Sequence, residues 1–349
     1  MRALILAGLI VAGGGAAAQT PREIPRAADG HPDLQGVWSA NVATTLERPD
    51  DVKTLVVTPE QAKKLIADFN KNDEKVYDPD FDAPGAKIET LLEVNGELRS
   101  SLLIEPADGK LPLTALAKAV NARRDDLRKK NFDNPEERSP GERCVLGAGD
   151  PPLVFFADLI PSQIIQTPGA IAIGTEDTHG GRIVAMGGTA PPDAVRSRVG
   201  YSVGHWEGDT LVVVTDHFSA DDPWGVQFRD AAMVSRASRV TEWITMISPD
   251  VIRYRFTIED PALYSGPWLA EVMMKRSKDR LYEYACHEGN YAMAHILLAA
   301  RLGKQKPPPE KTDDKDKKDA KADAKPGEKK PAEKKLAATK AVDVKAAPN

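Results

Sequence analysis

The sequence predicts a mainly β protein: a curved antiparallel meander or lipocalin-like barrel with two N-terminal helices and a C-terminal helix. Three observations support this fold class. After residue 140 the chain has a succession of short runs rich in β-branched and aromatic residues, separated by turn residues. Residues 200–214 have the pattern of a β-hairpin, with the turn residues Glu207, Gly208 and Asp209 at its tip. Residues 251–258 alternate between apolar and polar side chains, as expected for a strand with one face in water.

The β region contains eight such runs. They are residues 164–167, 170–175, 182–186, 210–216, 239–248, 251–259, 268–275 and 281–286. Short links join most of them, which favours an antiparallel meander. Rolling this sheet up would bury its apolar face and remove its exposed edges, so a barrel or strongly curved sheet is favoured over an open flat one.

Two helices are predicted before the sheet and one after it. Thr58 has the position of an N-cap, Pro59 that of the first helical residue and Gln61 that of the capping-box partner. Thr114 is the expected N-cap of the second helix. The predicted helices cover residues 59–69, 115–130 and 291–301, and two short strands are expected near residues 87–92 and 101–105.

The chain divides into four predicted parts. Residues 1–18 have the positive start, short apolar core and small-residue cleavage pattern of a secretory signal peptide. Residues 19–140 are predicted to form an extended and helical region, residues 141–303 an antiparallel β domain, and residues 304–349 a disordered charged tail. Because the apolar core of the first part is too short to span a bilayer, cleavage is expected and the protein is predicted to be periplasmic or secreted.

Charge is distributed unevenly between these parts. The tail has fourteen Lys against nine Asp and Glu, a net charge of +5, whereas the whole chain has −5 and the remainder therefore −10. An anionic folded part argues against nucleic acid as its main partner. The cationic tail has two interpretations, contact with anionic envelope surfaces or simply added solubility.

The chain has two cysteines, Cys144 and Cys286. In an oxidising compartment such a pair tends to oxidise, so one disulfide is expected. The alternative is two separate buried thiols.

Polar residues with catalytic potential concentrate at the predicted turns between strands. Imidazole exchanges protons near neutral pH, and a carboxylate that orients it raises its basicity. His205 or His287 is therefore the candidate general base. Glu207 or Glu288 would orient it. The alternative is structural, because Glu207 also belongs to a turn that satisfies its own backbone, and His217 lacks an obvious partner in the sequence.

A second group of residues is predicted to contact a ligand. The aromatic members would line an apolar site, and the basic members would hold a polar group or an anion. The group consists of Trp206, Tyr201, Arg182, His179 and Arg143.

Metal and cofactor chemistry are not expected. The sequence has no HExxH and no paired CxxC, so a zinc site would require His179, His205 and His287 to converge through the fold. It also has no GxSxG elbow, no P-loop lysine motif and no GxGxxG after a strand, which argues against a serine hydrolase and against nucleotide chemistry. No cofactor is therefore predicted.

Several segments of the chain resemble those of a widespread family of exported bacterial proteins without an assigned function. They are residues 33–38 (DLQGVW), 111–114 (LPLT), 142–144 (ERC), 163–169 (QIIQTPG), 202–213 (SVGHWEGDTLVV), 257–261 (TIEDP) and 282–291. These segments span most of the expected mature chain. The resemblance implies export, but the family has no settled reaction.

The chain departs from this family at three places. Relatives tend to have a His-Asp-x-Arg element where this chain has residues 179–182 (HGGR), a second His near Thr189, and a His-Ser-acid triplet near residues 234–236. A site built on those groups would be weakened here, which favours an altered site or a binding role. His205, Glu207 and residues 286–288 are retained.

The sequence supports three functional hypotheses. The leading one is an exported barrel-like protein that binds a small apolar or aromatic ligand. The alternative is a cofactor-free hydrolase, isomerase or lyase that uses a His/Glu pair at the sheet turns. The third is an envelope scaffold that acts through the cationic tail.

Overall fold

The computed structural model describes most of the chain between residues 23 and 305. The described residues are 23–74, 87–129, 134–138, 143–144, 151–153, 161–176, 181–219, 232–283, 285–288 and 291–305. The predicted signal peptide and residues 306–349 of the predicted tail lie outside them.

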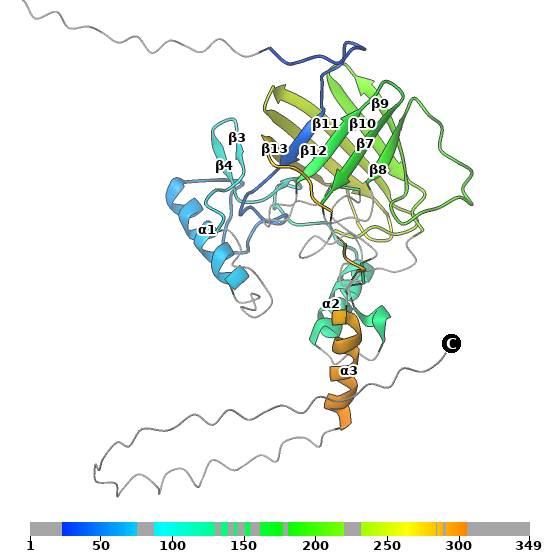
Figure 1. Ribbon diagram of the computed structural model, residues 1–349. Helices are drawn as coiled ribbons and strands as arrows, with labels where there is room; N and C mark the ends of the chain where they lie inside the picture. The colour runs from blue at the N-terminus through cyan, green and yellow to red at the C-terminus, as the bar shows by residue number, and fades with distance from the viewer. Residues whose placement is uncertain are drawn as a thin grey trace, which may run out of the picture. The chain divides into compact units, whose positions relative to one another are not determined.

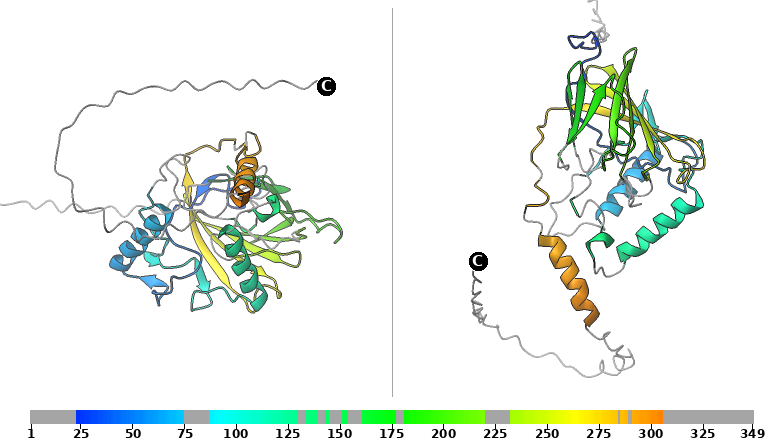
Figure 2. Two further views of the ribbon diagram at one scale, coloured as in Figure 1. Left: turned by 90° about the horizontal axis from the view of Figure 1, so that it is seen from below. Right: turned by 90° about the vertical axis from the view of Figure 1, so that its right-hand side faces the viewer.

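Nine strands of the described chain form a closed barrel (Figure 1). They are β1 (Gly36–Ser39), β6 (Ser162–Gln166), β7 (Ala170–Thr175), β8 (Arg182–Met186), β9 (Tyr201–Glu207), β10 (Thr210–Asp216), β11 (Arg239–Ser248), β12 (Val251–Glu259) and β13 (Leu269–Ser277). The short strand β1 pairs with β6 on one side and with β13 on the other, and so joins the two ends of the sheet. The further views in Figure 2 show the green strands of one wall and the yellow strands of the other. The prediction of a mainly β protein with a barrel is confirmed.

The predicted hairpin is formed by β9 and β10. Glu207 pairs with Thr210, which leaves a two-residue turn. Its first residue, Gly208, has φ +58°, a conformation that glycine adopts without a Cβ clash. The turn of β9–β10 and that of β11–β12, at residues 249–250, lie at the same end of the barrel, here called the hairpin end. The opposite end, where β8 begins at Arg182 and β10 stops at Asp216, is here called the loop end.

Two features of the sheet differ from the predicted antiparallel meander. Strands β8 and β9 run parallel, whereas the other barrel pairs that the structure describes are antiparallel. The link over residues 187–200 is long enough to return the chain to the end where β8 begins. The run predicted at 281–286 contains no strand among its described residues. Because β13 already pairs with β12 on one side and with β1 and β5 on the other, it offers no free edge there.

Strand alternation places the apolar side chains inside the barrel. In β12, the inward residues Ile252, Tyr254, Phe256 and Ile258 are buried and the residues between them are half-buried. Large aromatic residues fill much of the interior, and Phe256 packs edge-on against Trp268 with 5.8 Å between ring centroids. The barrel interior is therefore a packed core, and an apolar ligand would have to bind toward one of its ends.

A smaller unit lies between the barrel strands β1 and β6 in sequence. It combines a three-stranded sheet, formed by β2 (Val56–Val57), β3 (Glu93–Val94) and β4 (Glu97–Arg99), with helix α1 (Pro59–Glu74). The predicted capping box at its start is confirmed: Gln61 N donates to Thr58 Oγ1 at 3.3 Å and Thr58 N donates to Gln61 Oε1 at 2.9 Å. Helix and sheet share a second apolar core around Val57, Ala62 and Leu91.

The remaining elements are β5 (Leu103–Glu105), α2 (Ala115–Lys129), the 3₁₀ turn η1 (Pro135–Glu137) and α3 (Tyr291–Gln305). Strand β5 extends the sheet beside β13. Thr114 caps α2 as predicted, accepting a hydrogen bond from Ala117 N at 3.1 Å. Helix α3 extends two residues into the predicted tail. None of the helices in the described part of the chain is long and apolar enough to cross a bilayer.

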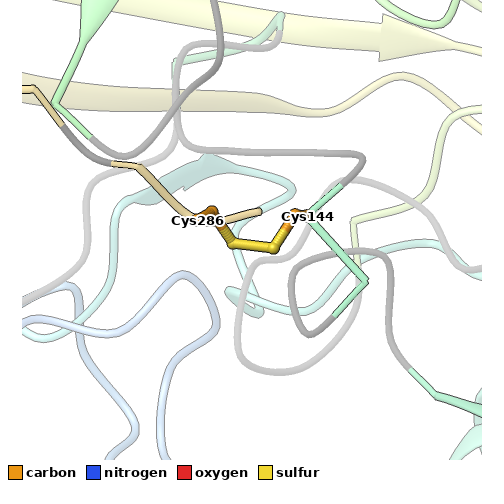
Figure 3. The surroundings of a disulfide bond; sticks show 2 residues. All are labelled: Cys144 and Cys286. Carbon is orange, nitrogen blue, oxygen red and sulfur yellow. A yellow bond between two sulfur atoms is a disulfide. The ribbon is translucent and has the colours of Figure 1, made fainter. Parts of the chain in front are cut away.

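The predicted disulfide is present. Cys144 and Cys286 are bonded, with their Cα atoms 5.7 Å apart and 142 residues between them in sequence. Figure 3 shows that the bond joins two segments outside the regular elements. A disulfide of this kind is typical of exported proteins.

Candidate functional site

A charged network lies inside the barrel, in the half nearer the loop end. Arg182, the first residue of β8, makes a bidentate ion pair with Glu242 of β11, with N–O distances of 2.5 and 2.6 Å. The two side chains are 2% and 0% exposed. Charges this deeply buried persist only when they are paired and hydrogen-bonded, and a fork of two parallel bonds is the strongest form of such a pair.

Tyr254 completes the first layer of this network. Its hydroxyl donates to Glu242 Oε1 at 2.7 Å and accepts from Leu153 N at 2.8 Å. Burial, and after it the charge of Glu242, raises the pKa of Tyr254 well above its usual value. The phenol therefore stays protonated and serves as a hydrogen-bond donor. Through Leu153 it also ties the segment before β6 to the barrel interior.

Two hydroxyl groups form a second layer beside Arg182. Ser202 Oγ of β9 and Thr215 Oγ1 of β10 are 2.7 Å apart, and either can be the donor. They lie 3.5 and 3.4 Å from Arg182 Nη1. These hydroxyls therefore lie directly beside the Arg182–Glu242 ion pair.

An Asp–His pair lies at the loop end directly after Thr215. His217 Nδ1 is 2.5 Å from Asp216 Oδ1, and the side chains are 14% and 29% exposed. Arg239 lies 3.9 Å from the other oxygen of Asp216. His217 has φ +60°, a left-handed conformation that is uncommon for a non-glycine residue. A histidine held through Nδ1 by a carboxylate directs Nε2 away from it, which is the arrangement of a general base.

The hairpin end of the barrel is covered by residues 26–35, the blue segment above the strands in Figure 1. The His31 ring stacks on Trp206, with centroids 4.5 Å apart and planes at 3°. Arg26 makes two bonds to Asp209, at 2.5 and 2.7 Å. Leu34 N donates to Gln166 Oε1 at 2.8 Å.

Beneath this segment, the cationic side chain of Arg276 lies over the barrel interior at the hairpin end. The Arg276 guanidinium is 4.2 Å from the centroid of Trp38 and donates to the carbonyl oxygens of Gln35 and Pro249. Together with residues 26–35 it closes the hairpin end.

The predicted catalytic residues separate into two places. His205 Nε2 is 3.1 Å from Glu207 Oε1, and these side chains are 52% and 63% exposed. They lie on the outer face of β9, because the alternate residues Ser202 and Gly204 are the buried ones. His287 and Glu288 are exposed residues that follow the disulfide, and none of the contacts among described residues joins them to His205 or Glu207.

The predicted ligand-binding residues are also divided. Arg182 lies in the buried network, whereas Tyr201 is half-buried on the outer face of β9. Trp206 points inward at the hairpin end, where His31 covers it. Arg143 is half-buried next to the disulfide. His179 lies outside the described residues.

Sequence reasoning missed Glu242, the ion-pair partner of Arg182, and Tyr254, which donates a hydrogen bond to Glu242. A signal for Glu242 was available: it occupies the same phase of its strand as Val240 and Ile244, so a carboxylate stands on the apolar face. A charged residue in such a position predicts a buried partner. The identity of that partner depends on tertiary pairing.

The described residues contain no group of three or more His, Cys, Asp or Glu side chains that could hold a metal ion. Comparison of the chain with protein-family models, with curated proteins and with solved structures found no significant match. Its function must therefore be argued from the site itself.

Proposed function

We propose that the protein is an extracytoplasmic binding protein that takes a small, neutral, largely apolar or aromatic ligand at the loop end of its barrel. The observation that carries this proposal is the buried network of Arg182, Glu242 and Tyr254 within an otherwise apolar interior. Small-molecule sites combine apolar walls with a few fixed polar groups, and the mouths of barrels are common places for them.

The charge of the network favours a neutral ligand. Arg182 is already neutralised by Glu242, so a ligand carboxylate or phosphate would bring a net charge into a region of low dielectric. The Ser202–Thr215 pair instead suits a ligand hydroxyl or carbonyl, since these hydroxyls can reorient to donate or accept.

The closed hairpin end supports entry from the loop end. Arg276 and residues 26–35 cover the hairpin end, and the aromatic core fills the middle of the barrel. The ligand would therefore lie above Thr215 and Ser202. Export, which the disulfide and the family resemblance both favour, would place this site in the periplasm or outside the cell.

Binding can be tested with a pair of probes that differ by one hydroxyl, naphthalene and 1-naphthol, titrated by tryptophan fluorescence. We expect saturable binding of both and tighter binding of 1-naphthol. Thr215→Val should abolish this preference, a change of several-fold, because a net hydrogen bond contributes about 0.5–1.5 kcal/mol.

The matched control is Thr210→Val on the same strand. Thr210 points outward, and its Oγ1 lies 2.8 Å from Thr245 Oγ1. The Thr210→Val substitution therefore breaks a hydroxyl pair like Ser202–Thr215, but on the outer face of the barrel. It should leave the preference for 1-naphthol unchanged. Absence of saturable binding, or equal effects of the two substitutions, would overturn the proposal.

A second candidate function, a cofactor-free hydrolase, isomerase or lyase, is favoured by the Asp216–His217 pair. This pair is better enclosed than His205–Glu207 and directly follows Thr215 in sequence, with Asp216 on the outer face of β10 by alternation. Hydrolysis of 4-nitrophenyl esters that His217→Gln abolishes and His205→Gln preserves would support it. Turnover no faster than in buffer, or retained in His217→Gln, would remove this candidate for ester substrates.

A further inference from the structure

The outer faces of β11, β12 and β13 carry a row of large side chains. Trp243 of β11 is paired with Arg255 of β12, and Arg255 is paired in turn with Glu271 of β13. Alternation directs all three away from the interior, because their neighbours within each strand face the core. Arg253, two residues before Arg255 on β12, shares this outer face. These four residues are here called the outer-wall cluster.

Charged groups of the outer-wall cluster are buried without a partner. Glu271 is 8% exposed, and no hydrogen bond or ion pair between described residues involves its carboxylate. The Nε atom of Arg253 is also buried, with no hydrogen-bond partner among those residues. Arg255 is half-buried, and within the same part of the chain its guanidinium bonds to no other residue, although Glu271 is its cross-strand neighbour. Buried charges are costly unless they are paired, so donors and an acceptor are available here for a ligand.

The chemistry and spacing of the cluster fit sugar rings that carry carboxylates. Adjacent strands lie about 4.8 Å apart, so the row from Trp243 to Glu271 is about 10 Å long, roughly the length of two sugar rings. The half-buried Trp243 offers an apolar indole surface on which the C–H face of a ring can pack. The guanidinium groups of Arg253 and Arg255 match the geometry of a carboxylate, and the Glu271 carboxylate can accept hydrogen bonds from ring hydroxyls.

We propose that the outer-wall cluster binds an acidic saccharide. Strands β11, β12 and β13 are each paired on both sides, so they offer no free backbone edge to which an extended peptide could add. Recognition must therefore use side chains alone, and an indole face, two guanidinium groups and a carboxylate suit rings with both hydroxyls and carboxylates. The proposal is independent of ligand binding at the loop end, because the cluster faces away from the barrel interior.

Binding can be tested by isothermal titration calorimetry of the purified chain with trigalacturonate, an acidic trisaccharide, and with maltotriose, a neutral one. The wild type should prefer trigalacturonate, and added salt should reduce this preference because it screens the attraction between carboxylate and guanidinium. Arg255→Gln should bind trigalacturonate about tenfold more weakly, as expected for the loss of a charge-assisted hydrogen bond. Trp243→Leu keeps an apolar side chain on β11 but loses the planar ring, so it should weaken binding of both saccharides.

The matched control is Arg198→Gln, which removes the same charge from an exposed position in the link between β8 and β9. It should bind both saccharides like the wild type, and circular dichroism should show that all three variants are folded. Absence of saturable binding of trigalacturonate to the wild type, or equal affinity of Arg255→Gln and Arg198→Gln, would rule the assignment out. Tighter binding of hexaglutamate than of trigalacturonate would also rule it out, since the cluster would then recognise an acidic peptide.

Discussion

The Arg182–Glu242 pair allows a quantitative test of the barrel interior. In Arg182→Met the Glu242 carboxylate stays buried, and the Tyr254 hydroxyl is its one remaining side-chain hydrogen-bond partner among the described residues. Leaving one member of a buried ion pair unpaired costs about 3–5 kcal/mol. Arg182→Met should therefore reduce the free energy of unfolding by about that amount.

The double variant Arg182→Met/Glu242→Gln separates the unpaired charge from the loss of packing. Glutamine keeps an acceptor for the Tyr254 hydroxyl and carries no charge. We expect it to recover at least about 2 kcal/mol of the stability that Arg182→Met loses, within the range of couplings that double-mutant cycles measure for contacting residues.

The assay is urea unfolding with the disulfide kept oxidised. With a slope of about 3 kcal/mol per M urea, the midpoint of Arg182→Met should fall by about 1–1.7 M. Arg26→Met is the control, because it breaks the exposed pair with Asp209, and it should shift the midpoint far less. A shift in Arg182→Met no larger than in this control, or a double variant no more stable than Arg182→Met, would refute the reasoning.

Three further predictions concern stability elsewhere. Replacing both Cys144 and Cys286 by Ala removes the disulfide, which joins two residues 142 positions apart in sequence. Its loss should lower the free energy of unfolding by about 5 kcal/mol and the melting temperature by about 10–20 °C in calorimetry. Thr58→Ala removes the N-cap of α1 and should cost about 1 kcal/mol in urea unfolding; an unchanged midpoint would show that the cap is dispensable. Arg26 lowers the pKa of Asp209, so their pair stabilises the folded state above the ordinary aspartate pKa of about 4, and this contribution disappears as the pH falls through the lowered pKa. The urea midpoints of Arg26→Met and the wild type should therefore differ near neutral pH and converge in acid, and a difference that persists at low pH would contradict this assignment.

The fold was predictable wherever local signals are strong. The runs 170–175, 182–186, 210–216, 239–248 and 251–259 were predicted with the bounds that the structure shows. In each of them the alternation of side chains, or a continuous run of β-branched residues, carries the information within the strand itself. The capping residues Thr58 and Thr114 were recognisable for the same reason.

Features that depend on distant pairing were not predictable. Strand β1 has four residues, and its partners β6 and β13 are more than a hundred residues away in sequence. The parallel pairing of β8 and β9 depends on the path of residues 187–200, which no local pattern specifies.

The same distinction applies to the candidate site. His205 and Trp206 are adjacent in sequence, but alternation places them on opposite faces of β9. Arg182 was predicted to hold a ligand, yet it pairs with Glu242, which is 60 residues away in sequence, and Tyr254 in turn bonds to Glu242. Sequence reasoning can identify a charge in an apolar strand, whereas its partner is set by the order of strands around the barrel.

Hydrogen–deuterium exchange with and without saturating 1-naphthol tests most directly whether ligands bind at the loop end. Ligand should slow exchange at the start of β8 and β9 and at the end of β10, around Arg182, Ser202 and Thr215. The hairpin-end turns at residues 167–169 and 208–209 should exchange at unchanged rates. Protection at these turns, or at the outer face around His205, with none around Thr215 would contradict the proposed site.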